Sequence, residues 1–188
     1  RLPGTPEDKK TMDYIEAKLV NLGFNIEKKD VYITKEWRPS EWSLNYEFND
    51  KSYSIASAFP TGENIKHLDS SFKTELVWVG LGSEADFIGK DIKGKAVVIY
   101  SFFVPGGRSH SASSRAELFY ANKIASEKGA ALIINIMGVP GDAMFAGGAF
   151  HGTSGKPASS FNAPVITISQ DEGFLLRDRM LKETIFID

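Results

Sequence analysis

The sequence has 188 residues, of which 42% are hydrophobic and 24% charged, the composition of a folded domain that can bury a core of its own. The 24 acidic and 22 basic residues give a net charge of −2, which argues against the basic surface of a nucleic-acid-binding domain. The absence of cysteine excludes disulfides, thiolate zinc sites and cysteine nucleophiles, and no apolar run is long enough to cross a bilayer.

The first predicted element is a helix near the N-terminus. Thr5 suits the N-cap, Pro6 suits the first helical position, and two acidic residues follow at the positive end of the helix dipole. Gly23 is expected to end the helix, and an edge strand is expected over residues 24–33, interrupted by charged residues. The helix carries an apolar stripe that needs a partner surface, formed by Met12, Ile15, Leu19 and Leu22.

Aromatic side chains spaced among polar residues mark the next segment, residues 35–60. Residues 44–48 and 52–55, joined across Asn49-Asp50-Lys51, predict a β-hairpin. We interpret the aromatic residues as packing on a sheet, with an aromatic ligand platform as the alternative. They are Trp37, Trp42, Tyr46, Phe48, Tyr53 and Phe59.

The centre of the chain, residues 94–136, predicts a β-α-β unit. Residues 95–100 and 131–136 are short, apolar and rich in β-branched side chains, which is typical of buried strands. Between them, a capping box from Ser114 to Glu117 predicts the start of a helix that Gly129 ends. Two buried strands joined by a helix imply a parallel pair.

Further strands and one more helix are expected around this unit. Residues 75–79 predict a strand that ends at Gly80, and residues 163–168 predict another after a loop of small residues. A second capping box, from Ser169 to Glu172, predicts the start of the last helix. A short strand over residues 185–187 follows it.

Three motifs suggest ligand sites, but their context favours ordinary loops. Residues 80–85 have the glycine spacing of a dinucleotide-binding loop, yet the next strand ends in Ser101 instead of an acid, so we predict a turn. Residues 152–156 fail as a phosphate loop because Pro157 replaces the hydroxyl residue. His67 and Asp69 form an H-x-D pair without the third ligand that zinc needs.

The loop before the central helix is the remaining candidate site. Arg108, Ser109 and His110 could bind an anion at the helix N-terminus, although such loops often only connect elements. A small hydrolase using His110 or His151 is a weaker alternative, because neither histidine has a nucleophile or acid at supporting spacing.

The order of these motifs resembles a protease-associated (PA) domain. The matching segments are ELVWVG at 75–80, DFIG at 86–89, DIKGKAVVI at 91–99, EKGAALII at 127–134 and APVITIS at 163–169, followed by Glu172-Gly173. Residues 1–6 (RLPGTP), the first helix and residues 22–24 resemble the segment that precedes this domain in zinc aminopeptidases related to glutamate carboxypeptidase II and the transferrin receptor.

The resemblance implies a fold and a division of the chain. The expected class is α+β, a β/β/α sandwich with a parallel β-α-β core, preceded by a helix and an edge strand. Residues 1–34 would flank the peptidase domain, and residues 35–188 would form the PA-like domain. The peptidase domain would carry the two zinc ions through motifs that are expected after the PA domain. His67 and Asp69 precede the PA core and lack the G-A-x-D-N segment, so no zinc ligation is assigned to them.

The first functional hypothesis is therefore a non-catalytic lid or peptide-recognition domain of a zinc aminopeptidase. Its partners would be the peptidase domain of the same protein and a peptide substrate, without nucleic acid or a membrane span. No cofactor is expected within the chain itself, and the resemblance implies a secreted, periplasmic or cell-envelope protein. The alternative is a stand-alone protein- or peptide-interaction module. The candidate contact residues are Trp37, Trp42, Arg108, Ser109 and His110.

Overall fold

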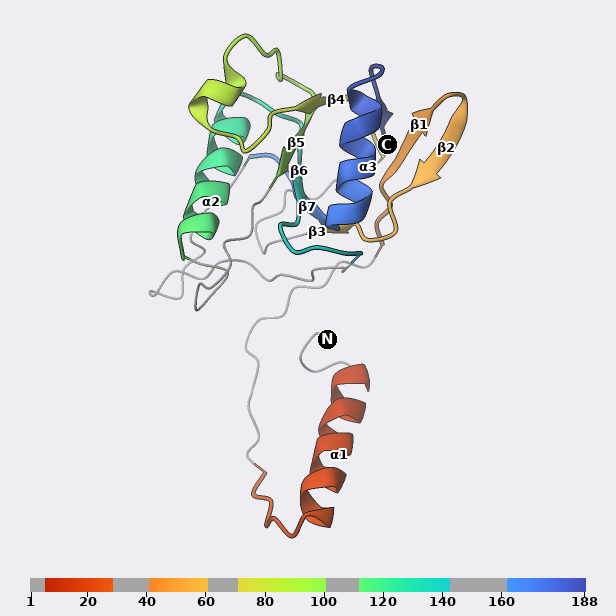
Figure 1. Cartoon of the computed structure of the whole chain (residues 1–188), viewed down its shortest axis with the longest axis vertical. Helices are drawn as coiled ribbons and strands as arrows, with labels where there is room; N and C mark the ends of the chain where they lie inside the picture. The colour runs from red at the N-terminus through yellow and green to blue at the C-terminus, as the bar shows by residue number, and fades with distance from the viewer. Residues whose placement is uncertain (1–5, 29–40, 61–70, 101–111, 143–161) are drawn as a thin grey trace. The chain divides into compact units, whose positions relative to one another are not determined.

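The computed structural model describes residues 6–28, 41–60, 71–100, 112–142 and 162–188 (Figure 1). The chain divides into two compact units, Arg1–Arg38 and Pro39–Asp188. The boundary predicted after residue 34 falls between the described ranges, so it stays a prediction.

The first unit contains the predicted N-terminal helix. Helix α1 spans Pro6–Asn21, and Gly23 follows it with a φ of 85°, the left-handed conformation expected at a helix end. No residue of α1 is buried, and Met12 and Leu22 of the apolar stripe are 58% and 73% exposed. The strand predicted over Phe24–Ile26 is wrong, since these residues form no strand. An extended segment needs a hydrogen-bonding neighbour, and none of the described residues pairs with this one.

The second unit is built on one mixed sheet of eight strands in the order β2-β1-β8-β4-β5-β6-β7-β3. Strands β4 to β7 run parallel, whereas β1, β2, β3 and β8 join the sheet through antiparallel pairs. This arrangement confirms the predicted α+β class with its parallel core. The strands are β1 (Asn45–Phe48), β2 (Lys51–Ser54), β3 (Phe59–Pro60), β4 (Thr74–Trp78), β5 (Ala96–Tyr100), β6 (Leu132–Ile136), β7 (Val165–Ile168) and β8 (Phe186–Ile187).

The parallel strands are covered on both faces. Helix α2 (Ala112–Glu127) packs on one face and α3 (Gln170–Met180) on the other, as Figure 1 shows. Because side chains alternate along a strand, Ile134 joins the core under α3 while its neighbour Ile133 joins the core under α2. All five residues of β6 are buried, which explains why four of them, all except Asn135, are apolar.

The central helix begins earlier than its sequence signal predicted. Helix α2 starts at Ala112, so Ser114 lies within its first turn and is not the N-cap. Neither Ala112 nor Ser113 opposes helical geometry, and the helix therefore extends beyond the capping signal. Its predicted end is confirmed, because Gly129 has a φ of 84°.

The glycine-rich turn after β4 serves packing. Gly80 and Gly82 have φ values of 59° and 75°, and the 3₁₀ helix Glu84–Phe87 follows them. A Cβ atom on Gly82 would lie 2.5 Å from the Cβ of Ala121 in α2. The turn predicted in place of a dinucleotide loop is confirmed, and its second glycine permits the close approach of α2.

The hairpin is also confirmed, and the last strand connects it to the core. Asn49 and Asp50 have φ values of 51° and 58°, as the two central residues of a type I′ turn require. Strand β8 lies between β1 and β4, pairing Tyr46 and Thr74 with Ile187. The predicted C-terminal strand therefore joins the hairpin to the parallel strands.

Substitution of Gly173 tests the close packing of α3 on β6. A Cβ atom at this position would lie 2.5–2.9 Å from three side-chain carbons of Ile136. We expect Gly173→Ala to lower the free energy of unfolding by about 1–3 kcal/mol, although Ala is the better helix former by up to about 1 kcal/mol. Urea denaturation measures the effect. The double variant with Ile136→Ala should lose less than the sum of the single losses, whereas additive losses or a stabilising Gly173→Ala would contradict the packing.

Candidate functional site

Of the predicted contact residues, the structure describes only Trp42. The residue is 41% exposed, its Nε1 donates a hydrogen bond to the Ala58 carbonyl at 2.7 Å, and its ring meets the Phe59 ring edge-on at 5.3 Å between centroids. Trp42 is thus held in place with part of its ring open to a ligand. Trp37, Arg108, Ser109 and His110 lie outside the described residues, as do His67, Asp69 and His151.

The carboxyl ends of the parallel strands define one edge of the sheet. Segment 101–111, which contains Arg108 to His110, follows directly on Tyr100 at the end of β5. Segment 143–161 follows β6 after a short described turn. In open sheets with parallel strands, ligands bind outside these carboxyl ends. The candidate loop of the sequence is therefore attached where this architecture places ligands.

A chain of hydrogen bonds connects the segments at this edge. The Ser169 hydroxyl donates to an Asp142 carboxylate oxygen at 2.7 Å, and the Ser169 amide donates to the Ser57 hydroxyl at 2.8 Å. Both serines are buried, so unpaired groups here would be costly. The bonds fix the turn after β6, the segment before β3 and the start of α3 to one another.

Glu172 completes this network in a way that the sequence did not predict. The Ser169 hydroxyl accepts from the Glu172 amide at 3.3 Å, which is one half of the predicted capping box. The Glu172 carboxylate does not return to Ser169. It accepts from the amides of Ala56 and Ser57 at 3.0 and 2.8 Å and from the Ser57 hydroxyl. The capping box is thus half formed, because a distant segment supplies Glu172 with more donors than its own helix does.

Tyr100 and Gln170 form a second contact at the same edge. The Gln170 side-chain amide donates to the Tyr100 hydroxyl at 3.2 Å and to the Gly138 carbonyl at 3.4 Å. The Tyr100 ring packs against Phe174 at 5.1 Å between centroids. These half-buried groups present hydroxyl, amide and aromatic surface at the end of β5.

Arg179 of α3 holds the aromatic residues of the hairpin. Its guanidinium lies 3.8 Å from the centroid of Tyr53 and 5.1 Å from that of Phe48, and it donates to the Tyr46 hydroxyl. Burial raises the pKa of Tyr46, and the positive charge of Arg179 partly opposes the rise. These three rings therefore pack within the fold, as the sequence interpretation favoured. The role of Arg179 had no sequence signal, since the hairpin lies far away in the chain.

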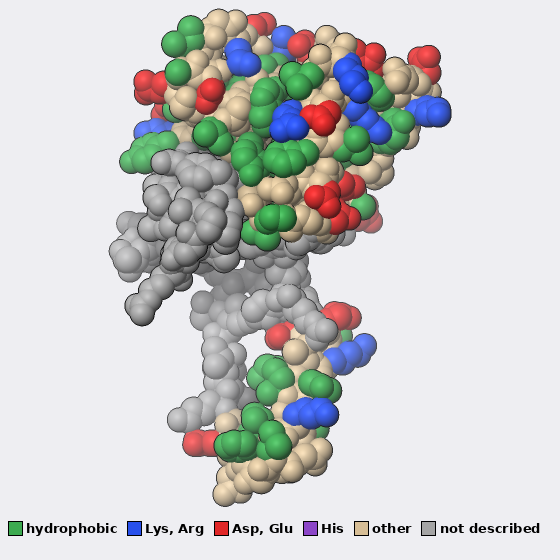
Figure 2. All heavy atoms as spheres, viewed as in Figure 1, with side chains coloured by type: hydrophobic (Ala, Val, Ile, Leu, Met, Phe, Trp, Pro, Cys, Tyr) green, Lys and Arg blue, Asp and Glu red, His purple; other side chains and the backbone are tan. Residues whose placement is uncertain are grey.

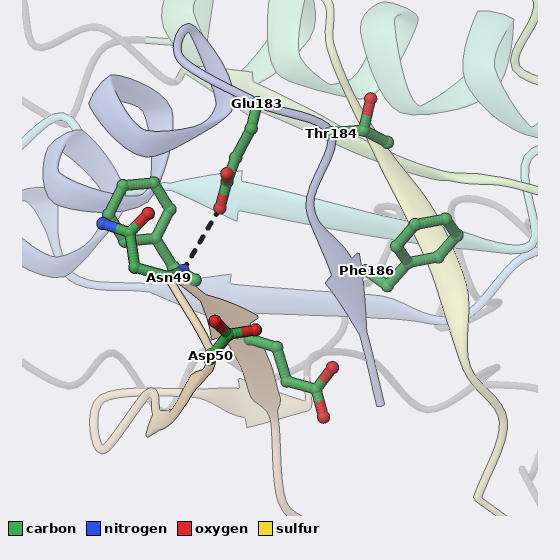
Figure 3. Close-up of a pocket in the computed structure, with 7 residues that line it drawn as sticks. Asn49, Asp50, Glu183, Thr184 and Phe186 are labelled. Carbon is green, nitrogen blue, oxygen red and sulfur yellow. Dashed lines mark hydrogen bonds between the residues drawn. The ribbon is translucent and has the colours of Figure 1, made fainter.

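One open pocket of about 340 Å³ lies between the hairpin turn and the segment after α3 (Figure 3). In it the Glu183 carboxylate accepts a hydrogen bond from the Asn49 amide at 3.3 Å, with Asp50 next to it in the turn. Phe186 of β8 lines the same pocket and is 45% exposed. The lining residues are Glu47, Phe48, Asn49, Asp50, Glu183, Thr184 and Phe186.

The described residues offer no metal centre, and one face of the larger unit carries charges of both signs. Among them, no three histidine, cysteine, aspartate or glutamate side chains are grouped as a metal site requires. Over the larger unit, Figure 2 shows acidic and basic side chains interspersed with hydrophobic ones. No described helix is both long enough and apolar enough to cross a membrane.

Solved structures of several peptidases have a similar fold. The chain matches an aminopeptidase from Aneurinibacillus sp. strain AM-1 (TM-score 0.55, 24% identity) and a peptidase M28 precursor from Shewanella amazonensis SB2B (TM-score 0.63, 19% identity). It also matches BSAP, a zinc aminopeptidase from Bacillus subtilis (TM-score 0.51, 17% identity). Each match covers 100% of this chain but only 39%, 42% and 39% of the other chains. No protein-family model matches the sequence, and neither does any curated protein.

Substitution of Glu172 tests the network at the strand edge. We expect Glu172→Gln to lower the free energy of unfolding by about 1–3 kcal/mol. The NH₂ group of glutamine would face a backbone N–H group whose hydrogen bond a carboxylate oxygen now accepts. Asp171→Asn removes the same charge from the same helical turn and is the matched control. Urea denaturation of both variants gives the difference, and equal losses would contradict the role assigned to Glu172.

Proposed function

We propose that this chain is the non-catalytic PA domain, with its preceding N-terminal segment, of a zinc-dependent aminopeptidase. One observation carries the proposal: three peptidase structures match the whole chain in fold over about two fifths of their own length. The order of sequence motifs from residue 75 to residue 173 supports it independently. The zinc would belong to the remaining part of the enzyme, as the resemblance to zinc aminopeptidases implies.

Helix α1 carries an apolar stripe that the described residues of its own compact unit leave uncovered. An amphipathic helix gains most of its stability by packing its apolar face, yet no residue of α1 is buried among the described residues. Met12 and Ile15 on the helix remain exposed, as does Leu22 directly after it. We propose that the peptidase domain covers this stripe in the whole enzyme.

The proposed role of residues 35–188 is to limit access to the active site or to recognise the peptide substrate. The network of Ser57, Ser169 and Glu172 gives the sheet edge a rigid base, and the candidate loop leaves the sheet there. Arg108, Ser109 and His110 would contact the substrate from this edge, and Trp37 and Trp42 would do so from the aromatic segment. The resemblance further leads us to propose a secreted, periplasmic or cell-envelope location.

The proposal predicts that the purified 188-residue chain is inactive by itself. We expect it to bind no stoichiometric zinc and to hydrolyse no aminoacyl-anilide, because the catalytic ligands would lie in another domain. Metal analysis and an anilide assay measure the two properties. Tight zinc binding with turnover would contradict the proposal, and so would a gene that does not encode an H-x-D and G-A-x-D-N pair beyond Asp188.

A second prediction concerns the lid role in the full-length protein. Arg108→Ala and His110→Ala should raise KM for longer peptides severalfold and leave the hydrolysis of a small aminoacyl-anilide unchanged, because the anilide is too short to reach the lid. Lys182→Ala on the exposed last turn before β8 is the control. Equal effects on both substrates, or none on either, would contradict substrate recognition by this loop.

A further inference from the structure

The two outer strands of the sheet differ in what they offer a partner. At one end of the strand order lies β3, which has two residues and contains Pro60, a residue without a backbone N–H group. At the other end lies β2 (Figure 1), a four-residue strand without proline that pairs with β1 without a bulge. No described strand pairs with the outer side of β2. An uninterrupted outer strand of this kind can accept an extended chain as a further strand.

The pairing register shows which backbone groups of β2 point outwards. The Ile55 amide donates to the Leu44 carbonyl at 2.9 Å, so these two residues form a hydrogen-bonded pair of the hairpin. Hydrogen-bonded and non-hydrogen-bonded pairs alternate along an antiparallel ladder, which makes the pair of Tyr53 hydrogen-bonded as well. The N–H and C=O groups of Ser52 and Ser54 therefore point away from β1. Both serines are exposed, so a partner can reach these groups.

Arg179 of α3 places a positive charge beside the middle of β2. Its guanidinium lies 3.8 Å from the centroid of the Tyr53 ring, closer than to the rings of Phe48 and Tyr46 on β1, at 5.1 and 5.4 Å. Among the described residues, no carboxylate forms an ion pair with this guanidinium. Lys51 lies two residues before Tyr53 in β2, so its side chain is on the same face and adds a second positive charge.

We propose that β2 binds an extended segment of a partner protein as an additional antiparallel strand, and that an acidic side chain of this segment pairs with Arg179. The N–H and C=O groups of Ser52 and Ser54 bond to the backbone of the segment. The partner residue opposite Tyr53 forms a non-hydrogen-bonded pair with it, in which side chains lie closest and share one face. A carboxylate at this position meets the planar fork of the guanidinium. The backbone bonds supply affinity, and the acidic side chain supplies specificity.

NMR titration of the whole 188-residue chain with the capped tripeptide acetyl-Val-Glu-Val-amide tests this inference. We expect downfield shifts of the Ser52 and Ser54 amide protons, because both gain a hydrogen bond. The peptide should bind roughly threefold or more tightly than acetyl-Val-Gln-Val-amide, which has nearly the same shape without the charge. Arg179→Gln should remove this preference and leave the binding of the glutamine peptide in place.

Two substitutions of Ser54 separate strand addition from general attraction between charges. Ser54→Pro removes the outward N–H group but no bond to β1, and proline is tolerated at such an edge position. We expect it to weaken the binding of both peptides by roughly fivefold. Ser54→Ala keeps the N–H group and should bind as the unaltered chain does.

Four results would overturn the proposal. They are undiminished binding by Ser54→Pro, equal affinity for the two peptides, shifts centred away from residues 51–55, and pairing of two copies of the chain through β2 in the absence of peptide. The outcome is independent of zinc binding and peptidase activity.

Discussion

The burial of β6 is the constraint on which the rest of the larger unit depends. All five of its residues are buried, so helices must cover both faces of the sheet at this strand. Both helices pack very closely on their neighbours. At Gly173 of α3 there is no room for a Cβ beside Ile136 of β6, and at Gly82 in the turn after β4 there is none beside Ala121 of α2. The positions of α2, α3 and the turn after β4 all follow from the packing around this central strand.

The hairpin depends on a different kind of interaction. It lies outside the region that α2 covers, and its attachment to the core is partly polar: Arg179 stacks on the rings of Tyr53 and Phe48, and Glu172 binds the amides that follow β2. Both residues project from α3, while β8 joins the same hairpin to β4. Helix α3 therefore connects the apolar core to the hairpin and fixes the segment next to the strand edge.

The sequence predicted the elements whose signals are local. The continuous apolar runs of β5 and β6, the turn residues Asn49 and Asp50, and Gly129 each depend on a few neighbouring residues, and all were confirmed. The wrong predictions concern residues whose structure depends on a segment far away in the sequence, or on the lack of one. Glu172 has better donors at Ala56 and Ser57 than in its own helix, and Phe24–Ile26 has no strand beside it. The role of Arg179 and the pocket at Phe186 depend on contacts across more than 130 residues, which no local pattern records.

Two surfaces of the larger unit differ in the interactions that hold them in place. At the carboxyl edge, buried hydrogen bonds immobilise the base from which the loops leave, which suits a site that must hold recognition residues in register with a substrate. Nearer the hairpin, on the face of the sheet that α2 covers farther along, Glu47 and Phe186 are exposed. Different residues form the carboxyl edge and this exposed face of the sheet. Buried hydrogen bonds therefore hold the carboxyl edge in place, whereas strand pairing with β1 and β4 holds the exposed Phe186.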